Sequence, residues 1–439
     1  METFFAGDEG YEAEVAGFQT GVRHRPAAVV AASSADDVAG AVRLARARGA
    51  RVAVQATGHG ARVPADGVLV TTRRMAGVRV DPAARTAYVE AGVRWSAVIE
   101  QAAAHGLAPL AGSSPGVGAV GYTLGGGVGL LGRTFGYAAD HVRALDVVTS
   151  DGELRHVTAT SEPDLFWALR GGGELLGIVV GMEVALMPVP IVYGGGLHFD
   201  AAHAAAVLAA FRDLTGAAPE TLTSSVGMVG LPPIDAVPEP LRGRHVLHVR
   251  LASTEPLDPS LLAPLRAIGP LVDRVGEVPA ADVGSIYGDP DFPHAYVGDN
   301  VLLGELPPEL LAAVRTLAGP AASVPCVVDL RHLGGAMARA PEVANAVPYR
   351  EATHILRVLS PAGEPGAVDA ARAVHHEVFA AAAPFAVGRV AAFGYGPVGA
   401  DPSLPAPRDP ATTRRLAQVK DKFDPDGVFL SVVDANMCS

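Results

Sequence analysis

A chain of 439 residues is longer than one compact core usually allows, so we expect two domains or one domain with a large insertion. Hydrophobic residues make up 49% of the chain and charged residues 18%, a composition that argues against intrinsic disorder. The formal net charge of −12 argues against a nucleic-acid partner, because no basic excess is available to neutralise phosphates.

Cysteine content and apolar runs indicate the compartment. Two cysteines, Cys326 and Cys438, are too few for a disulfide framework. The first nine residues are acidic and lack the basic and apolar regions of a secretory signal. The richest apolar stretch, 117–131, is interrupted by glycines, so no membrane-spanning helix is predicted. We therefore expect a cytoplasmic protein with no membrane partner; the sequence predicts no oligomeric state and no metal site.

The first half of the chain alternates predicted strands and helices. A helix is expected to begin after Ser34, which with Asp37 resembles a capping box, and to end at Gly49. Asp151-Gly152 predicts a hairpin turn. Further helices are predicted at 95–105 and 161–169. The predicted strands are 28–31, 51–55, 68–72, 87–93, 142–149, 153–158 and 178–186.

The character of the sequence changes after the proline-rich segment 188–190. From there to about residue 405, predicted strands at 246–251 and 352–359 mix with predicted helices at 201–214 and 365–383. A final helix is predicted at 410–423, followed by a turn. No internal repeat is visible.

The strand predicted at 51–55 runs directly into a histidine flanked by glycines. Gly58 and Gly60 remove side-chain bulk on both sides of His59, so a large flat ligand could lie against the backbone there. Backbone N–H groups in such a turn can bind a pyrophosphate without a lysine. An ordinary turn histidine would explain the same residues equally well.

Two further motifs follow along the chain. Glycines are dense over 112–129, but no Gly-Lys-Ser/Thr follows and the spacing is too extended for a dinucleotide-binding fingerprint. A mobile glycine-rich loop is the alternative interpretation. The segment 165–173 reads Leu-Phe-Trp-Ala-Leu-Arg-Gly-Gly-Gly, in which Phe166 and Trp167 could equally be core residues.

In order and spacing, these motifs resemble the FAD-binding domain of the p-cresol methylhydroxylase superfamily, specifically its berberine-bridge-enzyme-like and 6-hydroxy-D-nicotine-oxidase-like branch. The resemblance covers roughly residues 22–195 and the last 30 residues. The residues that carry it are His59, 112–129, Asp151-Gly152, 164–173, and Lys420 with Asp424, Pro425 and Phe429.

The resemblance implies an α+β fold in two parts. An FAD-binding domain of this type would occupy residues 1–195. A substrate-binding domain, with helices covering an antiparallel sheet, would occupy 196–405. The C-terminal segment, 406–439, would return to the FAD-binding domain.

The resemblance also implies how FAD is bound. His59 would be the covalent attachment point, and the cysteine that forms a second bond in some members falls at Ser114, so no cysteinyl link is expected. The residues expected to contact FAD are Ala56, Thr57, Gly58, His59, Gly60, Ala61, Gly112, Ser114, Val117, Gly118, Gly121, Tyr122, Gly125, Gly126, Gly127, Gly129, Gly177, Ile178, Val179 and Tyr395.

The implied reaction is transfer of a hydride from a substrate C–H to flavin N5. Val117 falls where a small residue leaves room for O2, although packing against the ring is the alternative. Tyr395 is the first candidate to touch substrate. Tyr349 and His354 are further catalytic candidates, with core or surface roles as alternatives.

We expect an oxidase that uses O2 and acts on a small or medium-sized, mainly apolar organic substrate, as in secondary metabolism. Three alternatives stay open: a dehydrogenase with another acceptor, a redox-neutral cyclase on the same scaffold, and a binding protein without catalysis.

Overall fold

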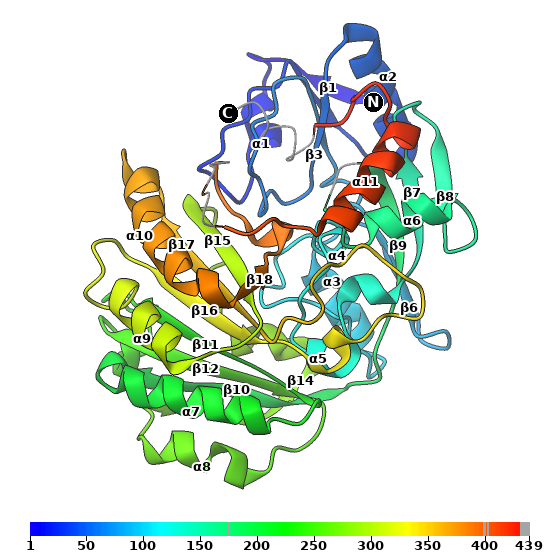
Figure 1. The fold of residues 1–439 in the computed structure, drawn as a ribbon. Helices are drawn as coiled ribbons and strands as arrows, with labels where there is room; N and C mark the ends of the chain where they lie inside the picture. Colours follow the sequence, from blue (N-terminus) through cyan, green and yellow to red (C-terminus); the bar gives the residue numbers. More distant parts are fainter. Residues whose placement is uncertain (174–175, 398–400, 402–403, 431–439) are drawn as a thin grey trace.

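The computed structural model describes residues 1–173, 176–397, 401 and 404–430. The described residues form three β-sheets: one of four strands, one of five and one of nine. Residues 1 to about 190 and the C-terminal segment build the upper part of the molecule in Figure 1, and the residues between them build the lower part.

The four-stranded sheet is mainly parallel. Helix α2 (Ala35–Arg48) lies on it, capped by Ser34, whose hydroxyl accepts a hydrogen bond from the Asp37 amide, and ended by Gly49 at φ 61°. Both ends of this helix were predicted from the sequence. A short helix, α1 (Tyr11–Val15), precedes it. In sheet order the strands are β1 (Glu2–Phe4), β2 (Ala28–Ala31), β4 (Val68–Thr71) and β3 (Val52–Gln55).

The five-stranded sheet is antiparallel and completes the upper part. Its strands, in sheet order, are β5 (Val78–Asp81), β6 (Thr86–Glu90), β9 (Ile178–Ala185), β7 (Val142–Val148) and β8 (Leu154–Val157). Trp95, Phe166 and Trp167 are buried in its core, so the two aromatic residues of the 165–173 motif are core residues. The helices of this part are α3 (Trp95–Ala103), α4 (Ala119–Leu124), α5 (Gly132–Phe135) and α6 (Pro163–Leu169).

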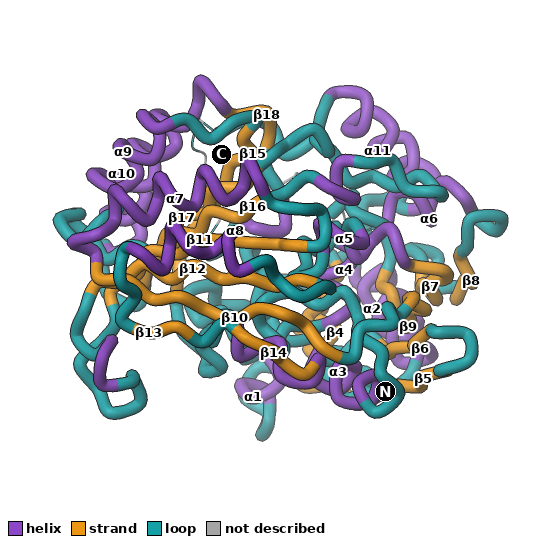
Figure 2. The backbone as a smooth tube through the Cα atoms, turned by 90° about the horizontal axis from the view of Figure 1, so that it is seen from below, coloured by secondary structure: helices purple, strands orange, loops and turns teal. Residues whose placement is uncertain are grey.

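The nine-stranded sheet forms the lower part and is antiparallel throughout. Its helices lie along one side and the upper part of the molecule along the other (Figures 1 and 2). The helices are α7 (Ala204–Ala217), α8 (Pro259–Ala267), α9 (Pro308–Leu317) and α10 (Ala367–Ala382). The strands are β10 (Ile191–Asp200), β11 (Leu222–Gly230), β12 (His245–Ser253), β13 (Val272–Asp273), β14 (Gly276–Pro279), β15 (Tyr296–Leu303), β16 (Val327–His332), β17 (His354–Pro361) and β18 (Ala386–Gly388).

Alternation along the central strands separates the two faces of this sheet. On β16, Val328 and Leu330 point into the apolar core beneath the helices, as do Leu356 and Val358 on β17. Because successive side chains of a strand point to opposite faces, the residues between them face the upper part of the molecule. The predicted fold class, α+β with an antiparallel sheet covered by helices, is confirmed.

The C-terminal segment packs on the upper part of the molecule. Helix α11 (Pro410–Phe423) buries Leu416, Val419 and Phe423 in the core of the five-stranded sheet. The Leu430 amide then donates to the Val52 carbonyl at 2.8 Å, beside strand β3. These contacts support the proposed return of the chain to the first domain; residues 431–439 of that segment lie outside the described residues.

The other expected boundary needs adjustment. Strand β10 begins at Ile191 and pairs only with strands of the nine-stranded sheet. A boundary at residue 195 would cut this strand in its middle, so we propose that the first domain ends near Pro190.

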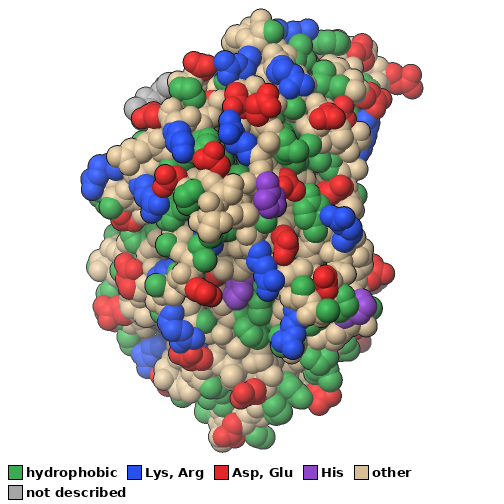
Figure 3. All heavy atoms as spheres, turned by 90° about the vertical axis from the view of Figure 1, so that its right-hand side faces the viewer, with side chains coloured by type: hydrophobic (Ala, Val, Ile, Leu, Met, Phe, Trp, Pro, Cys, Tyr) green, Lys and Arg blue, Asp and Glu red, His purple; other side chains and the backbone are tan. Residues whose placement is uncertain are grey.

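No helix in the described part of the chain is long and apolar enough to cross a membrane. On the face drawn in Figure 3, acidic and basic side chains are interspersed, and no continuous basic patch is visible.

Candidate active site

A cavity of about 700 Å³ lies between the glycine-rich turns of the upper part and the exposed face of the nine-stranded sheet. One wall consists of residues 53–63 and 112–128, which we call the turn wall. The opposite wall includes Tyr296, Arg331, Arg357 and Leu359, together with residues 389–395, and we call it the sheet wall. The cavity therefore joins the two parts of the molecule.

His59 lies on the turn wall with a fixed ring. Its Nδ1 lies 2.8 Å from the Thr57 hydroxyl, and the ring stacks on Phe18 with the centroids 3.8 Å apart. Its carbonyl accepts a hydrogen bond from the Tyr296 hydroxyl at 2.7 Å. Burial lowers the pKa of His59 to about 4, with a smaller contribution from the positive charge of Arg94. The imidazole is therefore neutral at pH 7 and can act as a nucleophile.

Gly58 is required by the path of the backbone beside His59. Its φ is +76°, and a Cβ at this position would lie 2.8 Å from the Cα of Gly17. A side chain would therefore push apart the two backbone segments that form the floor of the turn. Gly60, on the other side of His59, has open space around its Cβ position.

Most residues expected to contact FAD line this cavity. They are Ala56, Thr57, Gly58, His59, Gly60, Ala61, Gly112, Ser114, Val117, Gly118, Gly121, Tyr122, Gly125, Gly127 and Tyr395. A glycine-lined cavity of this volume, with a neutral histidine and a close-packed turn, fits a large flat cofactor such as FAD.

Five of the expected cofactor contacts are not among the residues that line the cavity: Gly126, Gly129, Gly177, Ile178 and Val179. Ile178 packs into the core beside the four-stranded sheet, and Val179 packs into the core of the five-stranded sheet. These residues belong to the scaffold behind the turn wall. Their position in a family motif could not show whether they contact FAD or only support the residues that do.

Tyr395 and Val117 face the cavity from opposite walls. The Tyr395 backbone pairs with Gly298 of β15, and its hydroxyl accepts a hydrogen bond from Arg357 Nη1 at 3.3 Å. Burial raises the pKa of Tyr395, against the opposing effect of Arg357 and Arg331. Tyr395 is therefore a neutral phenol at pH 7. Val117 is fixed through its carbonyl, which accepts from the Trp95 amide at 3.0 Å.

Tyr349 and His354, predicted as catalytic candidates, do not line the cavity. The Tyr349 hydroxyl donates to the Ala406 carbonyl at 3.1 Å. His354 is buried, with Nε2 3.3 Å from the Thr215 hydroxyl of α7. Because residues 354, 356 and 358 of β17 face the helix layer, His354 points away from the cavity. A position near a family motif did not reveal which face of the strand the residue occupies.

The sequence analysis missed a cluster of charges at the sheet wall. Asp329 lies at the centre of it, with 3% of its side chain exposed, and it forms ion pairs with Arg250, Arg331 and Arg357. Burial alone would raise the pKa of Asp329, but the three guanidinium groups outweigh burial and hold the pKa well below its usual value. One feature of the sequence could have indicated this cluster: Asp329 and Arg331 are charged residues at alternate positions of an otherwise apolar strand.

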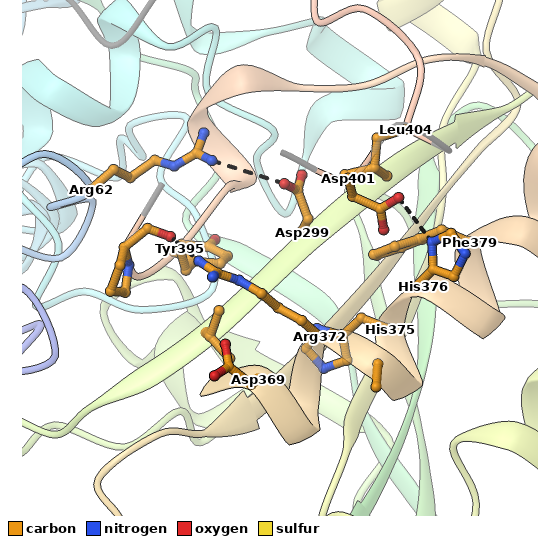
Figure 4. Close-up of a pocket in the computed structure, with 14 residues that line it drawn as sticks. Arg62, Asp299, Asp369, Arg372, His375, His376, Phe379, Tyr395, Asp401 and Leu404 are labelled. Carbon is orange, nitrogen blue, oxygen red and sulfur yellow. Dashed lines mark hydrogen bonds and ion pairs between the residues drawn. The ribbon is translucent and has the colours of Figure 1, made fainter. Parts of the chain in front are cut away.

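A second cavity, of about 370 Å³, lies behind Tyr395 and beside α10 (Figure 4). Arg62, Asp299 and Tyr395 line both cavities. The figure shows Arg62 directed toward Asp299, whose nearest oxygen is 3.9 Å away, and Arg372 between Asp369 and Tyr395. Asp299 also binds Arg389 at 3.1 Å. This ion-pair group separates the two cavities.

Comparisons with known proteins agree with this geometry. Residues 26–158 match the family model described as "FAD binding domain". Over 194 residues the chain is 34% identical to (R)-6-hydroxynicotine oxidase of Paenarthrobacter nicotinovorans. The alignment covers 43% of this chain and 42% of that protein. The aligned segment thus spans less than half the length of this relative.

Solved structures match nearly the whole fold. The crystal structure of 6-hydroxy-D-nicotine oxidase from Arthrobacter nicotinovorans superposes with a TM-score of 0.83 at 22% identity, covering 98% of this chain and 96% of that one. A chitooligosaccharide oxidase superposes with a TM-score of 0.81 at 20% identity, covering 98% and 95%. Residues 26–158 therefore match an FAD-binding domain, and the whole chain has a fold similar to that of p-cresol methylhydroxylase-type FAD-binding proteins.

Proposed function

We propose that this protein is an FAD-dependent oxidase that acts on a small or medium-sized organic substrate, of the kind found in secondary metabolism, with O2 as electron acceptor. The observation that carries the proposal is that His59, Val117 and Tyr395 line one cavity between the FAD-binding domain and the nine-stranded sheet. FAD bound there would supply hydride acceptance and reoxidation. Relatives named as oxidases support the reaction class.

His59 is the proposed covalent attachment point. Its ring is neutral at pH 7, and its Nδ1 contact with Thr57 fixes the ring while leaving the second nitrogen for bond formation. Ser114 lines the same cavity but carries a hydroxyl in place of a thiol, so the proposal includes no second link.

Tyr395 is the proposed contact to the substrate. Its buried hydroxyl lies 3.3 Å from Arg357 Nη1, and the positive charge stabilises the phenolate if the substrate's proton is relayed onward through this group. The same wall also carries Val327, Leu359 and Phe393, which suits an organic substrate with an apolar portion.

Mass spectrometry tests the attachment. The peptide that contains Gly58-His59-Gly60 should carry the added mass of FAD, and the yellow colour should stay with the protein after acid precipitation. His59→Ala should lose the covalent link yet still bind some FAD, because the backbone contacts of the turn remain. An unmodified peptide from yellow protein would show that the cofactor is bound without a covalent bond.

Reoxidation kinetics test the oxidase assignment. Photoreduced protein mixed with air-saturated buffer should reoxidise much faster than free flavin, and Val117→Leu should slow this step by narrowing the space beside residue 117. A wild-type rate equal to that of free flavin would favour the dehydrogenase alternative. The redox-neutral cyclase would be favoured if no substrate bleached the flavin spectrum under nitrogen.

A further inference from the structure

The charges of the sheet wall do not balance. Arg250 Nη1 lies 2.9 Å from Asp329 Oδ1, while Arg331 Nε and Arg357 Nη2 lie 2.6 and 2.9 Å from Oδ2. Three guanidinium groups therefore share one carboxylate, and the group carries a formal charge of +2. Asp289 also lines the cavity near Arg331, but it is exposed at the surface and forms no ion pair with an arginine in the described part of the chain.

The strand register explains why these side chains converge. Asp329 of β16 is directly opposite Arg357 of β17, and Ser225 of β11 is opposite both Arg250 of β12 and Arg331 of β16. Each of these residues occupies the sheet face that looks away from the helices. The cluster is thus built by four adjacent strands and is rigid before any ligand binds.

Two aromatic rings hold the guanidinium planes. Arg250 and Arg331 lie over the Tyr287 ring, at 4.4 and 4.9 Å from its centroid. Arg357 lies over the Phe393 ring at 4.7 Å. Cation–π contacts orient a guanidinium group but supply no negative charge. The positive excess therefore remains, in a site where only 7% of the Arg331 side chain and 14% of the Arg357 side chain are exposed.

Arg331 and Arg357, the two arginines of the cluster that line the cavity, have N–H donors without acceptors among the described residues. Arg331 donates through Nε to Asp329 and through Nη2 to Ser113, and Arg357 donates through Nη1 to Tyr395. Arg331 Nη1 has no hydrogen bond in the described part of the chain. Arg357 Nε is buried and also has no partner there. Buried cations with unused donors are costly unless an anion meets them.

We propose that the substrate carries a carboxylate group, which Arg331 and Arg357 bind at the sheet wall, and an apolar body that lies against Val327, Leu359 and Phe393. This inference rests on the proposed function, since it places the substrate in the same cavity. A carboxylate fits because the planar fork of a guanidinium matches its two oxygens and carries the opposite charge. A neutral carbohydrate would leave the excess charge unbalanced.

Matched pairs of small ligands test this inference on the protein as purified with its FAD. The probes are acetate, benzoate and 3-phenylpropanoate, each beside its amide of nearly the same shape, and a neutral disaccharide. Binding is followed by the flavin absorbance and, independently, by the shift in melting temperature, which reads carboxylate binding even in colourless protein. At least one carboxylate should bind roughly tenfold to a hundredfold more tightly than its amide.

Arginine variants test which residues cause the preference for a carboxylate over its amide. Arg331→Gln and Arg357→Gln should each remove most of it, and Arg357→Lys should keep part of it, because the charge remains while the fork is lost. Arg244→Gln is the matched control: this arginine flanks the same sheet at the surface, pairs with Asp200 and should leave the preference unchanged. Melting curves of each variant show whether it is folded.

Two results would overturn the inference: no carboxylate preferred over its amide, or a disaccharide bound more tightly than every carboxylate. A preference that survives in both Arg331→Gln and Arg357→Gln would also reject it. Failure of the proposed function is distinguishable, because protein that holds FAD and reoxidises rapidly without preferring carboxylates refutes only the substrate class.

Discussion

The two walls of the cavity are built in opposite ways. The turn wall comes from two short stretches of chain, 53–63 and 112–128, and presents mainly backbone and small side chains. The sheet wall presents long side chains that strand pairing brings together from separate parts of the sequence, such as Arg331 and Arg357. The first wall is specified by local sequence, and the second only by the pairing of strands.

The walls also treat buried titratable groups differently. On the turn wall, burial lowers the pKa of His59 to about 4 and removes its charge at pH 7. On the sheet wall, Arg331 keeps its charge: burial alone would lower its pKa, but Asp329 outweighs burial and raises it. A neutral wall suits a cofactor held by backbone groups, and a charged wall suits recognition of a ligand.

The largest expected effect follows from removing the charge at the centre of the sheet wall. Asp329→Asn leaves three buried guanidinium groups without a counter-charge, so the free energy of unfolding should fall by about 3–5 kcal/mol. Denaturant titration measures this loss. Asp273→Asn is the control, because its ion pair with Arg266 is exposed and should contribute about 1 kcal/mol or less. If the free energy of unfolding fell equally in the two variants, the buried cluster would contribute no more to stability than an exposed ion pair.

A smaller effect is expected on the turn wall, where backbone geometry replaces charge. Gly58→Ala places a Cβ 2.8 Å from the Gly17 backbone at a φ of +76°, and should lower the free energy of unfolding by about 1–3 kcal/mol. The ratio of FAD to protein should fall with it. Gly60→Ala is the matched control for stability, with open space at its Cβ position, and its free energy of unfolding should stay within error of the wild type.

The contrast between the walls explains what the sequence could predict. The turn around His59, the capped helix after Ser34 and the C-terminal helix 410–423 each depend on residues that are close together in the chain, and the sequence indicated all three. Asp329 and Arg357 become partners only through the register of β16 against β17. That register depends on the packing of the whole sheet, which no short motif encodes.

His354 illustrates the same limit in the other direction. Its place beside a family motif predicted contact with the substrate, whereas strand alternation turns it toward α7. Arg357, three residues along the strand and on the opposite face, lines the cavity. For a residue on a strand, the sequence can indicate that it lies near the active site. Which face of the sheet its side chain occupies is known only from the placement of the strand in the sheet.

Acid should act through the buried histidines rather than through the charged cluster. His375, behind the sheet on α10, is 4% exposed with Nε2 2.9 Å from the Ser360 hydroxyl, and burial lowers its pKa to about 4. Since the unfolded chain takes up a proton near pH 6.5 and the folded protein does not, stability is present above pH 6.5 and is lost as the pH falls toward 4.

The free energy of unfolding should therefore decrease between pH 7 and pH 5, with His375 contributing about 1–2 kcal/mol of the decrease. His375→Gln keeps a hydrogen-bonding group and should flatten the slope by that amount. Denaturant titrations at the two pH values measure it. An unchanged slope in the variant would assign the acid sensitivity to the other buried histidines, such as His248 and His354.

The smallest effect is expected at Ser113, where the two walls touch. Its hydroxyl donates to Asp289 Oδ2 at 2.6 Å and accepts from Arg331 Nη2 at 3.4 Å. Ser113→Ala removes both contacts, but Asp289 is exposed to water and Arg331 keeps its shorter ion pair with Asp329. The free energy of unfolding should change by about 1 kcal/mol or less, and the FAD content should not change.

The same variant decides whether the walls act independently. If Asp329 alone positions Arg331, the preference for carboxylate over amide should survive Ser113→Ala within about twofold, a change of under half a kcal/mol. A loss as large as that in Arg331→Gln would mean that the turn wall aims the guanidinium group. In that case the loop that borders the cofactor would also set the substrate preference, and the sheet wall would supply only the charge.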